Sequence, residues 1–343
     1  MKTSALEKYT VRDVLEYRGH PQLHHCTSEY STIESALALM YAHDIVSLPV
    51  FTGPSSVDAA FIDIVSVYDL RDYIVHAQGL EKEVDFQLLS GHPSGAATVL
   101  QDTIAQVVKS RKHASQEISA RMPLEQLVRL FSTYEQHRVL IANVNDADAP
   151  AQVPTGARKR GGSVDSACSA VSFQSDAPMV CGLTQYDVVR FIQHHNHELG
   201  PVLDAPISAV ARVHAPLRPA VPGHMPHVTV RDTALNALTT MCNSHNSALP
   251  VVDRDGRLIT EIASTSMRGL ATGLLGLLGK PVLAYMFGLR VPVTSPYIVH
   301  ENFTLSQVMS GLLHMNCRRA WLVDSEERPI AVISLTDVLN HFL

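Results

Sequence analysis

The sequence has little cysteine and little charge for its 343 residues. Its five cysteines are scattered and form no C-x-x-C pair, so we expect neither a zinc cluster nor a disulfide framework, and this usage suits a reducing compartment. Charged residues make up 17% of the chain and the net charge is -6, which gives no electrostatic argument for binding nucleic acid or an anionic membrane. The sequence also lacks a nucleophile–base pair, a metal-ligand spacing and a phosphate-cradling glycine loop, so we expect a protein that is not an enzyme.

Long apolar runs are absent as well. The most apolar passage, residues 269–293, is interrupted by Lys280, Pro281 and Arg290, so no stretch reaches the ~18 apolar residues that span a bilayer. We expect this passage to form a buried helix pair or a linker between repeats. The first residues, MKTSALEKYTVRD, lack the apolar core of a signal peptide. These features predict a soluble protein of the cytoplasm, with the nucleus as a second compartment, and no membrane partner.

What the sequence does contain is one pattern repeated four times. In each copy an amphipathic helix is followed by a strand, a turn, a second strand and a second helix. The first helices are expected at residues 32–43, 124–134, 233–241 and 304–314, and the strands that follow them at 47–51, 138–143, 248–253 and 320–323. Ser66, Thr184 and Ser334 open the second helix in copies one, two and four, and copy three is expected to continue into a helix from Met267.

This pattern predicts an α/β (α+β) fold of four repeats, in which small mixed sheets are flanked by helices. The repeats are placed at residues 9–79, 90–198, 204–273 and 280–343. Because one such unit cannot close a core alone, we expect copies one and two, and copies three and four, to pair into two modules. The break between the modules falls near residues 200–223, which are rich in proline and glycine.

Copy two carries an insertion at about residues 145–178. It is rich in glycine, serine, alanine, proline and aspartate, and such a segment cannot bury enough apolar area to offset its ordering entropy. We therefore expect a disordered surface loop. Its ARKRGGS run could be a phosphorylation or localisation signal, although a solvated insertion is the favoured interpretation.

Two kinds of polar motif recur at equivalent places. An S/T-x-x-D motif begins the second helix in copies one, two and four, and a basic pair begins the first strand in copies two and four. A single S/T-x-x-D motif is usually a capping box, and a single basic pair is usually a solvated strand edge. Their repetition favours a ligand site, because free N–H groups and the positive end of the helix dipole lie at each strand-to-helix turn.

Three stretches carry a family resemblance. They are SALPVVDRDGRL in copy three, RRAWLVDSEERPIAVISLTDVL in copy four and GLTQYDVVRFI in copy two. They resemble the CBS domain, named for cystathionine β-synthase, and the whole chain is similar to a protein of four CBS repeats paired into two Bateman modules. Among such proteins it resembles the gamma subunit of AMP-activated (SNF1-type) protein kinase.

The resemblance implies an energy-sensing regulatory protein that binds AMP, ADP or ATP as regulatory ligands, has no cofactor, and has a kinase catalytic subunit and a scaffold subunit as partners. The implied ribose-binding residues are Asp69, Asp187 and Asp337, with Ser66, Thr184 and Ser334 beside them. The implied phosphate-binding residues are His137, Arg138, Arg318 and Arg319. A free-standing four-CBS regulator or scaffold that binds adenosyl ligands without a kinase partner is the alternative.

Copy three departs from this pattern. Ala263 and Ser266 hold the positions of the hydroxyl and the carboxylate, and serine cannot replace a bidentate acceptor, so we expect this pocket to be weak or empty. The HHNH run at residues 194–197 invites a metal interpretation, but neighbouring side chains at a helix end do not converge on one ion. Trp321 is expected to pack in the core.

Overall fold

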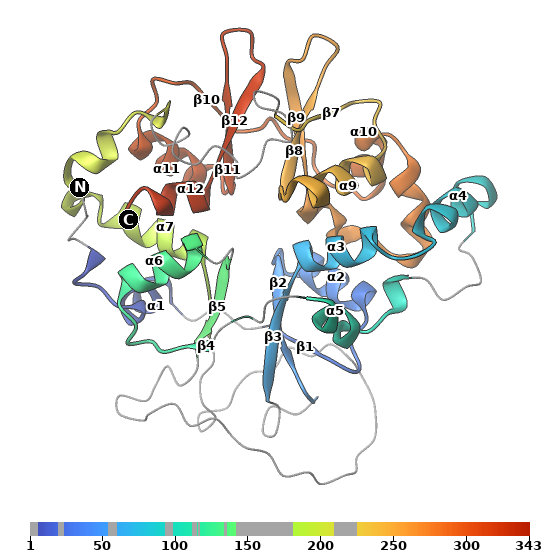
Figure 1. Cartoon of the computed structure of the whole chain (residues 1–343), viewed down its shortest axis with the longest axis horizontal. Coiled ribbons are helices and arrows are strands. Elements are labelled where there is room, and N and C mark those ends of the chain that lie inside the picture. Colours follow the sequence, from blue (N-terminus) through green and yellow to red (C-terminus); the bar gives the residue numbers. More distant parts are fainter. Residues whose placement is uncertain are drawn as a thin grey trace.

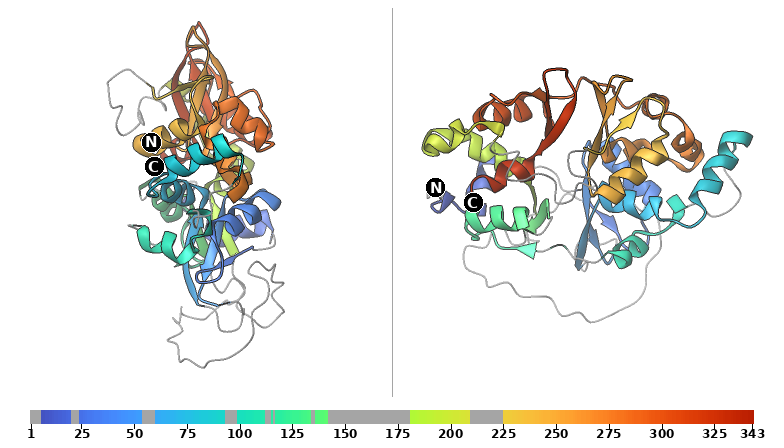
Figure 2. Two further views of the ribbon diagram at one scale, coloured as in Figure 1. Left: turned by 90° about the vertical axis from the view of Figure 1, so that its right-hand side faces the viewer. Right: turned by 45° about the horizontal axis from the view of Figure 1, so that its top comes forward.

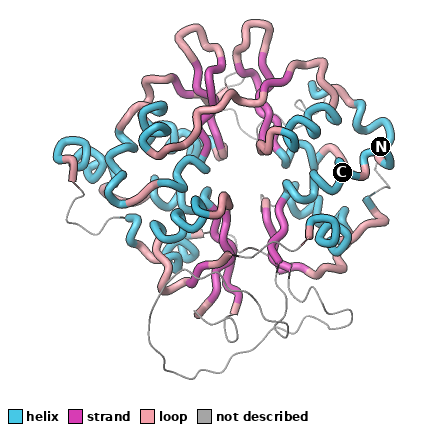
Figure 3. Tube along the Cα trace, turned by 180° about the vertical axis from the view of Figure 1, so that it is seen from behind, coloured by secondary structure: helices cyan, strands magenta, loops and turns pink. Residues whose placement is uncertain are grey.

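The computed structural model describes residues 6–19, 24–53, 60–92, 99–111, 115, 117–133, 136–141, 181–208 and 225–343. The molecule is flattened, with strands near its centre and helices around them (Figures 1, 2 and 3). The expected loop at 145–178 lies outside the described residues.

Each repeat contributes one three-stranded mixed sheet, which confirms the predicted fold class. A two-residue strand lies parallel to the central strand, and the central strand pairs antiparallel with the third. The sheets of repeats one to four are β1 (Cys26–Thr27), β2 (Ser47–Phe51) and β3 (Phe61–Ser66); β4 (Glu117–Ile118), β5 (Arg138–Ile141) and β6 (Cys181–Thr184); β7 (Val228–Thr229), β8 (Ala248–Val252) and β9 (Leu258–Ala263); and β10 (Ile298–Val299), β11 (Arg319–Val323) and β12 (Pro329–Ser334).

The first helices match the predicted positions because their apolar residues recur at helical spacing. In α2 (Ile33–Ala42), the residues Ile33, Ala36, Leu37 and Met40 are all fully buried. The corresponding helices are α6 (Leu124–Thr133), α9 (Ala234–Ser244) and α11 (Leu305–His314), and the second helices are α3 (Val67–Val75), α7 (Gln185–His194) and α12 (Leu335–Asn340).

Repeat three does not form the predicted α-helix from Met267. Its chain continues instead as two 3-10 helices, η5 (Ser264–Gly269) and η6 (Thr272–Gly279). Ala263 has no hydroxyl to accept the first helical N–H groups, and glycines at 269, 273 and 276 lower the helix propensity. The segment then enters α10 (Val282–Gly288), so the apolar passage packs as short helices. Among the described residues, no helix is long and apolar enough to cross a bilayer.

Within each half of the chain, a helix that precedes one repeat packs on its neighbour. Thr10, the N-cap of α1 (Val11–Arg18), forms a β-bridge with Pro123 at the start of the first helix of repeat two. Thr103, the N-cap of α5 (Ile104–Ser110), forms the same bridge with Thr32 of repeat one. Pro281, the N-cap of α10, does so with Thr233 of repeat three. Pro206 bridges Thr304 of repeat four in the same way. These exchanges join repeat one to two and repeat three to four.

The helical layers, by contrast, join the two halves. One apolar core combines helices of repeats two and four, with Phe131, Ile192 and Leu339 among its buried members. The other combines repeats one and three, with Leu37, Ile74 and Leu238. Figure 1 shows the first group of helices on the left and the second on the right, while the four sheets lie between them. Burial of these apolar faces therefore closes the ring of repeats. The helix α4 (Leu80–Ser90) extends from one edge and packs on η6.

Candidate functional site

The three S/T-x-x-D motifs all form capping boxes. The backbone N–H and the hydroxyl of Ser66 both donate to Asp69 Oδ2, at 2.7 and 2.5 Å. The corresponding distances are 2.9 and 2.7 Å from Thr184 to Asp187, and 2.7 and 2.6 Å from Ser334 to Asp337. Each box stabilises the start of a helix and uses one carboxylate oxygen, so the cap and a second role are compatible.

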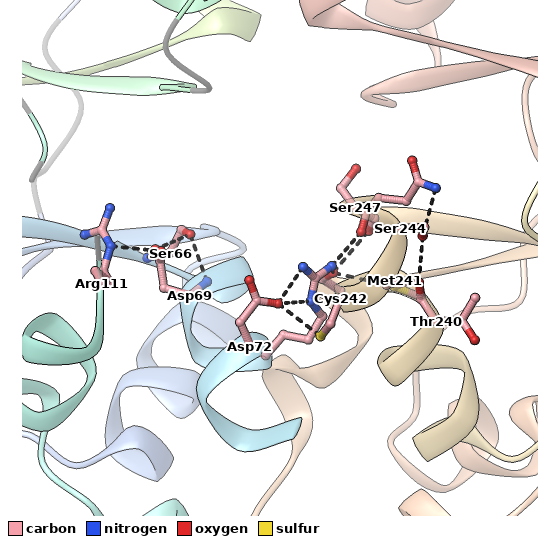
Figure 4. A network of polar contacts seen from close by, with 12 residues as sticks. Ser66, Asp69, Asp72, Arg111, Thr240, Met241, Cys242, Ser244 and Ser247 are labelled. Carbon is pink, nitrogen blue, oxygen red and sulfur yellow. Dashed lines mark hydrogen bonds and ion pairs between the residues drawn. The ribbon is translucent and has the colours of Figure 1, made fainter. Parts of the chain in front are cut away.

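Two of these carboxylates also form ion pairs with arginines that the sequence analysis did not identify. Arg111 Nε lies 3.0 Å from Asp69 Oδ1, and Arg18 Nη1 lies 3.1 Å from Asp187 Oδ2. Figure 4 shows the Arg111, Ser66 and Asp69 group. Arg111 also donates to the Ile64 carbonyl, and Arg18 to the Gly182 carbonyl. The strand registers place these two carbonyls at equivalent positions of their repeats.

A signal for these arginines exists in the sequence. Arg18 and Arg111 each stand at the eighth position after the threonine that caps the preceding helix, Thr10 and Thr103. What the sequence does not show is that each helix packs on the other repeat. In repeat three the arginine position is Leu289, the eighth residue after Pro281, and the aspartate position is Ser266. Both charges are therefore missing together. The Ser266 hydroxyl donates to the Ala263 carbonyl at 2.7 Å, so this turn has no carboxylate at all.

The predicted phosphate-binding residues lie around Tyr68, in the first turn of α3. The guanidinium carbon of Arg138 lies 5.7 Å from the centre of the Tyr68 ring, and the His137 ring lies 6.3 Å from it. Burial alone would raise the pKa of the Tyr68 hydroxyl, yet this pKa lies below its ordinary value. The opposing effect comes from four guanidinium groups that act on the hydroxyl: Arg138, Arg319, Arg318 and Arg71. Side chains of repeats one, two and four thus converge on one tyrosine.

Arg138 and Arg318 are the two arginines of this group without an ion pair among the described residues. Both are partly buried, and burial lowers the pKa of each guanidinium. A neighbouring arginine lowers each pKa further: the charge of Arg318 lowers the pKa of Arg138, and the charge of Arg319 lowers the pKa of Arg318. Arg138 Nε is buried without a hydrogen-bond partner in the described part of the chain. Such an arrangement is costly unless an anion completes it.

Arg319 differs from these two because it has an acidic partner. Its side chain is 8% exposed and its Nη1 lies 2.7 Å from Glu261 Oε1, on strand β9 of repeat three. Trp321 Nε1 donates to the other oxygen of Glu261 at 2.6 Å, and Arg319 Nη2 donates to Ser247 Oγ at 3.2 Å. Trp321 is fully buried, as expected. The Glu261 carboxylate thus pairs with Arg319, one of the residues that the family resemblance implies for binding a ligand phosphate.

His137 is not a cation at neutral pH. Burial, followed by the charge of Arg138, lowers its pKa to about 4. Its imidazole could therefore donate or accept a hydrogen bond at the centre, but the arginines carry the positive charge there. His137 directly precedes β5, next to Arg138 in the chain, and its ring lies edge-on to the Tyr68 ring.

Arg71 links repeat one to repeat three beside this centre. It is 4% exposed, forms an ion pair with Asp72 at 2.6 Å, and donates to the Asn246 carbonyl at 2.6 Å and to Ser264 Oγ at 2.9 Å. Figure 4 shows Asp72 beside Cys242 at this contact. A second link joins Arg268 of repeat three to Asp44 of repeat one at 2.7 Å. Both arginines are thus neutralised by carboxylates of the chain.

Metal binding finds no support in the described residues, where no group of three His, Cys, Asp or Glu side chains could hold an ion. The histidines at the end of α7 pack on aromatic rings instead. His194 lies 4.7 Å from the Tyr17 ring and His195 lies 4.3 Å from the Phe191 ring, measured between ring centres.

Comparison with known proteins agrees with this fold. Residues 289–343, which include the strands β10 to β12 and the helices α11 and α12 of repeat four, match the CBS domain. A crystal structure from Methanocaldococcus jannaschii, of a protein proposed to be an archaeal homolog of g-AMPK, matches the fold with a TM-score of 0.65. This match covers 98% of the present chain and 100% of the archaeal chain. The chain therefore has the fold of four CBS-type repeats, and its fourth repeat matches the CBS domain in sequence.

The CBS likeness concerns the fold, because sequence identity to the archaeal protein is 14%. An uncharacterized conserved protein from Pyrococcus horikoshii, also 14% identical, matches with a TM-score of 0.48 over 98% of this chain and 100% of its own. The search of curated proteins gives no match.

Proposed function

We propose that this CBS protein is a regulatory protein that binds an adenine nucleotide at its centre. The observation that carries the proposal is the pair Arg138 and Arg318, two partly buried guanidinium groups that form no ion pair among the described residues. A guanidinium group offers a planar fork of donors that matches phosphate oxygens and keeps its charge at any cellular pH. A phosphate group between them would neutralise both.

The carboxylates suit the sugar of the same ligand. Asp69 follows Tyr68 in the first turn of α3, and Arg138 lies 5.7 Å from the Tyr68 ring, so one nucleotide could contact a ribose-binding carboxylate and a phosphate-binding arginine. Asp69 Oδ2 accepts both hydrogen bonds of the capping box, so its lone pairs are used. Asp69 Oδ1 pairs with Arg111 and retains one lone pair for a ribose hydroxyl. We assign the ribose to Asp69, Asp187 or Asp337 with their capping hydroxyls, and the phosphate to Arg138 and Arg318 with His137.

Regulation would follow from the position of this ligand between repeats. A nucleotide held by Asp69 of repeat one, Arg138 of repeat two and Arg318 of repeat four stabilises the arrangement in which these groups converge. It changes the conformational equilibrium only by the difference between its affinities for the two states. A protein partner that contacts one arrangement can read this difference.

The partner proposed from the family resemblance is a kinase catalytic subunit with a scaffold subunit, as for a gamma-type subunit. A free-standing four-CBS regulator is the second candidate, and the loss of both Asp and Arg at Ser266 and Leu289 favours it, since one of four nucleotide turns is missing. Affinity purification of the full chain from its source cells distinguishes the two. Recovery of a kinase catalytic subunit in fixed proportion supports the first, and its absence at saturating nucleotide supports the second.

Titration calorimetry of the full chain with AMP, ADP, ATP and S-adenosylmethionine tests the binding proposal. We expect a saturable site for at least one adenine nucleotide, and a fall in affinity of at least about thirtyfold in Arg138→Ala, because a charge-assisted contact to phosphate contributes about 2 kcal/mol. Arg129→Ala is the control. Arg129 is 48% exposed and pairs with Glu125 one helical turn away, so its loss should leave the affinity unchanged. Equal affinities of the two variants would contradict the proposal.

A further inference from the structure

The charges around Tyr68 are nearly balanced by the chain itself. Arg71 pairs with Asp72, Arg268 with Asp44 and Arg319 with Glu261. Arg111 pairs with two carboxylates, Asp69 and Asp63. Among the described arginines that act on Tyr68, only Arg138 and Arg318 form no ion pair with a described carboxylate.

The Glu261 contact has the geometry of a bound anion. Both of its carboxylate oxygens are used, one by Arg319 at 2.7 Å and the other by the Trp321 N–H at 2.6 Å. Glu261 comes from the middle of β9, opposite Pro250, and reaches the first and third residues of β11 in the neighbouring repeat. Its side chain is 27% exposed, so the pair lies at the surface of the sheet and not in the helical core.

We propose that Glu261 occupies the phosphate position of Arg319 from within the chain and thereby limits the central site to one phosphate group. The site then takes a nucleoside monophosphate in preference to a triphosphate. This inference rests on the proposed nucleotide site and names the feature that sets its selectivity.

The preference follows from charge matching. A phosphate monoester carries about two negative charges at neutral pH, which matches the two guanidinium groups that have no ion pair. Further phosphate groups of ADP or ATP would lie near Arg319, where the Glu261 carboxylate already holds the guanidinium and repels an additional anion. Like charges brought together at an interface are strongly unfavourable. The second carboxylate beside Arg111, that of Asp63, lowers the net positive charge of the centre further.

The test is calorimetry of the full chain, wild type and Glu261→Gln, with AMP, ADP and ATP in turn at fixed ionic strength and without divalent cations. In the wild type we expect AMP to bind at least about tenfold more tightly than ATP, as one like-charge contact predicts. In E261Q, Arg319 becomes available, so ATP affinity should rise by about tenfold while AMP affinity changes by less than about threefold.

Glu326→Gln is the matched control. Glu326 also pairs with an arginine, Arg328, at 2.7 Å, and both residues belong to repeat four. Both side chains are about half exposed, so this variant should bind nucleotides like the wild type. Thermal unfolding of E261Q checks that the variant is folded. If E261Q does not fold, a displacement measurement on the wild type still tests the proposal. We expect inorganic phosphate to displace AMP from the wild type at least as well as tripolyphosphate does.

The outcomes separate the two proposals. If no adenine nucleotide binds, the proposed function fails. If nucleotides bind but wild-type ATP is as tight as AMP, or if E261Q leaves the ratio of the two affinities unchanged, the site stands and the role of Glu261 is overturned.

Discussion

Replacing Arg111 by methionine should destabilise the protein, because two carboxylates lose their cation. Arg111 ends the helix α5 and lies against repeat one, where its guanidinium group contacts two carboxylates, Asp63 Oδ2 at 2.8 Å and Asp69 Oδ1 at 3.0 Å. It also donates to the Ile64 carbonyl at 2.7 Å. Methionine keeps the apolar stem and removes all three contacts.

The magnitude follows from the burial of the carboxylate left behind. Asp63 is 2% exposed, and its remaining partners are the backbone N–H groups of Ile64 and Ser115. Removing one partner of a buried ion pair costs about 3–5 kcal/mol, because the other charge stays buried without compensation. Since the Arg111 side chain is 20% exposed, we expect the lower end of that range, about 3 kcal/mol.

Urea denaturation of the full chain measures this effect. With a slope of about 3 kcal/mol per molar urea for a chain of this size, the midpoint should fall by about 1 M. Arg129→Met is the control, since its exposed pair with Glu125 contributes no more than about 0.5 kcal/mol. Adding Asp63→Asn to Arg111→Met should recover part of the loss, because it removes the stranded charge. A midpoint shift for Arg111→Met no larger than that of Arg129→Met would refute the reasoning.

Two further perturbations test other parts of the structure. His137 has a pKa of about 4 in the folded protein against an ordinary value of 6.5, so its contribution to stability is complete above pH 6.5 and is lost as the pH falls through 4. Urea midpoints at pH 7.5, 5 and 4 should reveal a loss of up to about 3 kcal/mol, and His137→Asn should flatten this dependence; equal slopes for both proteins would contradict it. Gly311→Ala should cost about 1–3 kcal/mol, because the new Cβ would lie 2.1 Å from the Tyr297 hydroxyl, whereas Gly273→Ala meets nothing within 4 Å. Thermal unfolding checks the pair, and similar midpoints would exclude the clash.

The repeat architecture could be predicted from local patterns. Helices α2, α6, α9 and α11 appear where apolar residues recur at helical spacing, and the central strands appear at the short β-branched runs that follow them. The capping boxes at Ser66, Thr184 and Ser334 also follow from three-residue spacing. These features depend on neighbours in the chain, so the sequence is sufficient for them. The failure in repeat three has the same local character, since Ala263 removes the cap.

The ion pairs of the candidate site could not be predicted in this way. Arg18 and Arg111 stand far from Asp187 and Asp69 in sequence, and they meet only because each leading helix packs on the neighbouring repeat. The pairing of Arg319 with Glu261 likewise depends on the approach of two sheets from repeats three and four. Sequence spacing predicts which residues are polar, but it does not state which of them neutralise one another.

The sequence by itself determined four repeated units, the helices and strands within them, and their helix caps, because periodicity and capping act within a few residues. Only the tertiary structure decided that one apolar core joins repeats one and three while another joins repeats two and four. It also decided that two arginines at the centre, Arg138 and Arg318, form no ion pair among the described residues. The reason is physical. Hydrophobic burial is non-directional and joins whichever faces fit, and charges are then balanced by whatever that packing brings within a few ångströms.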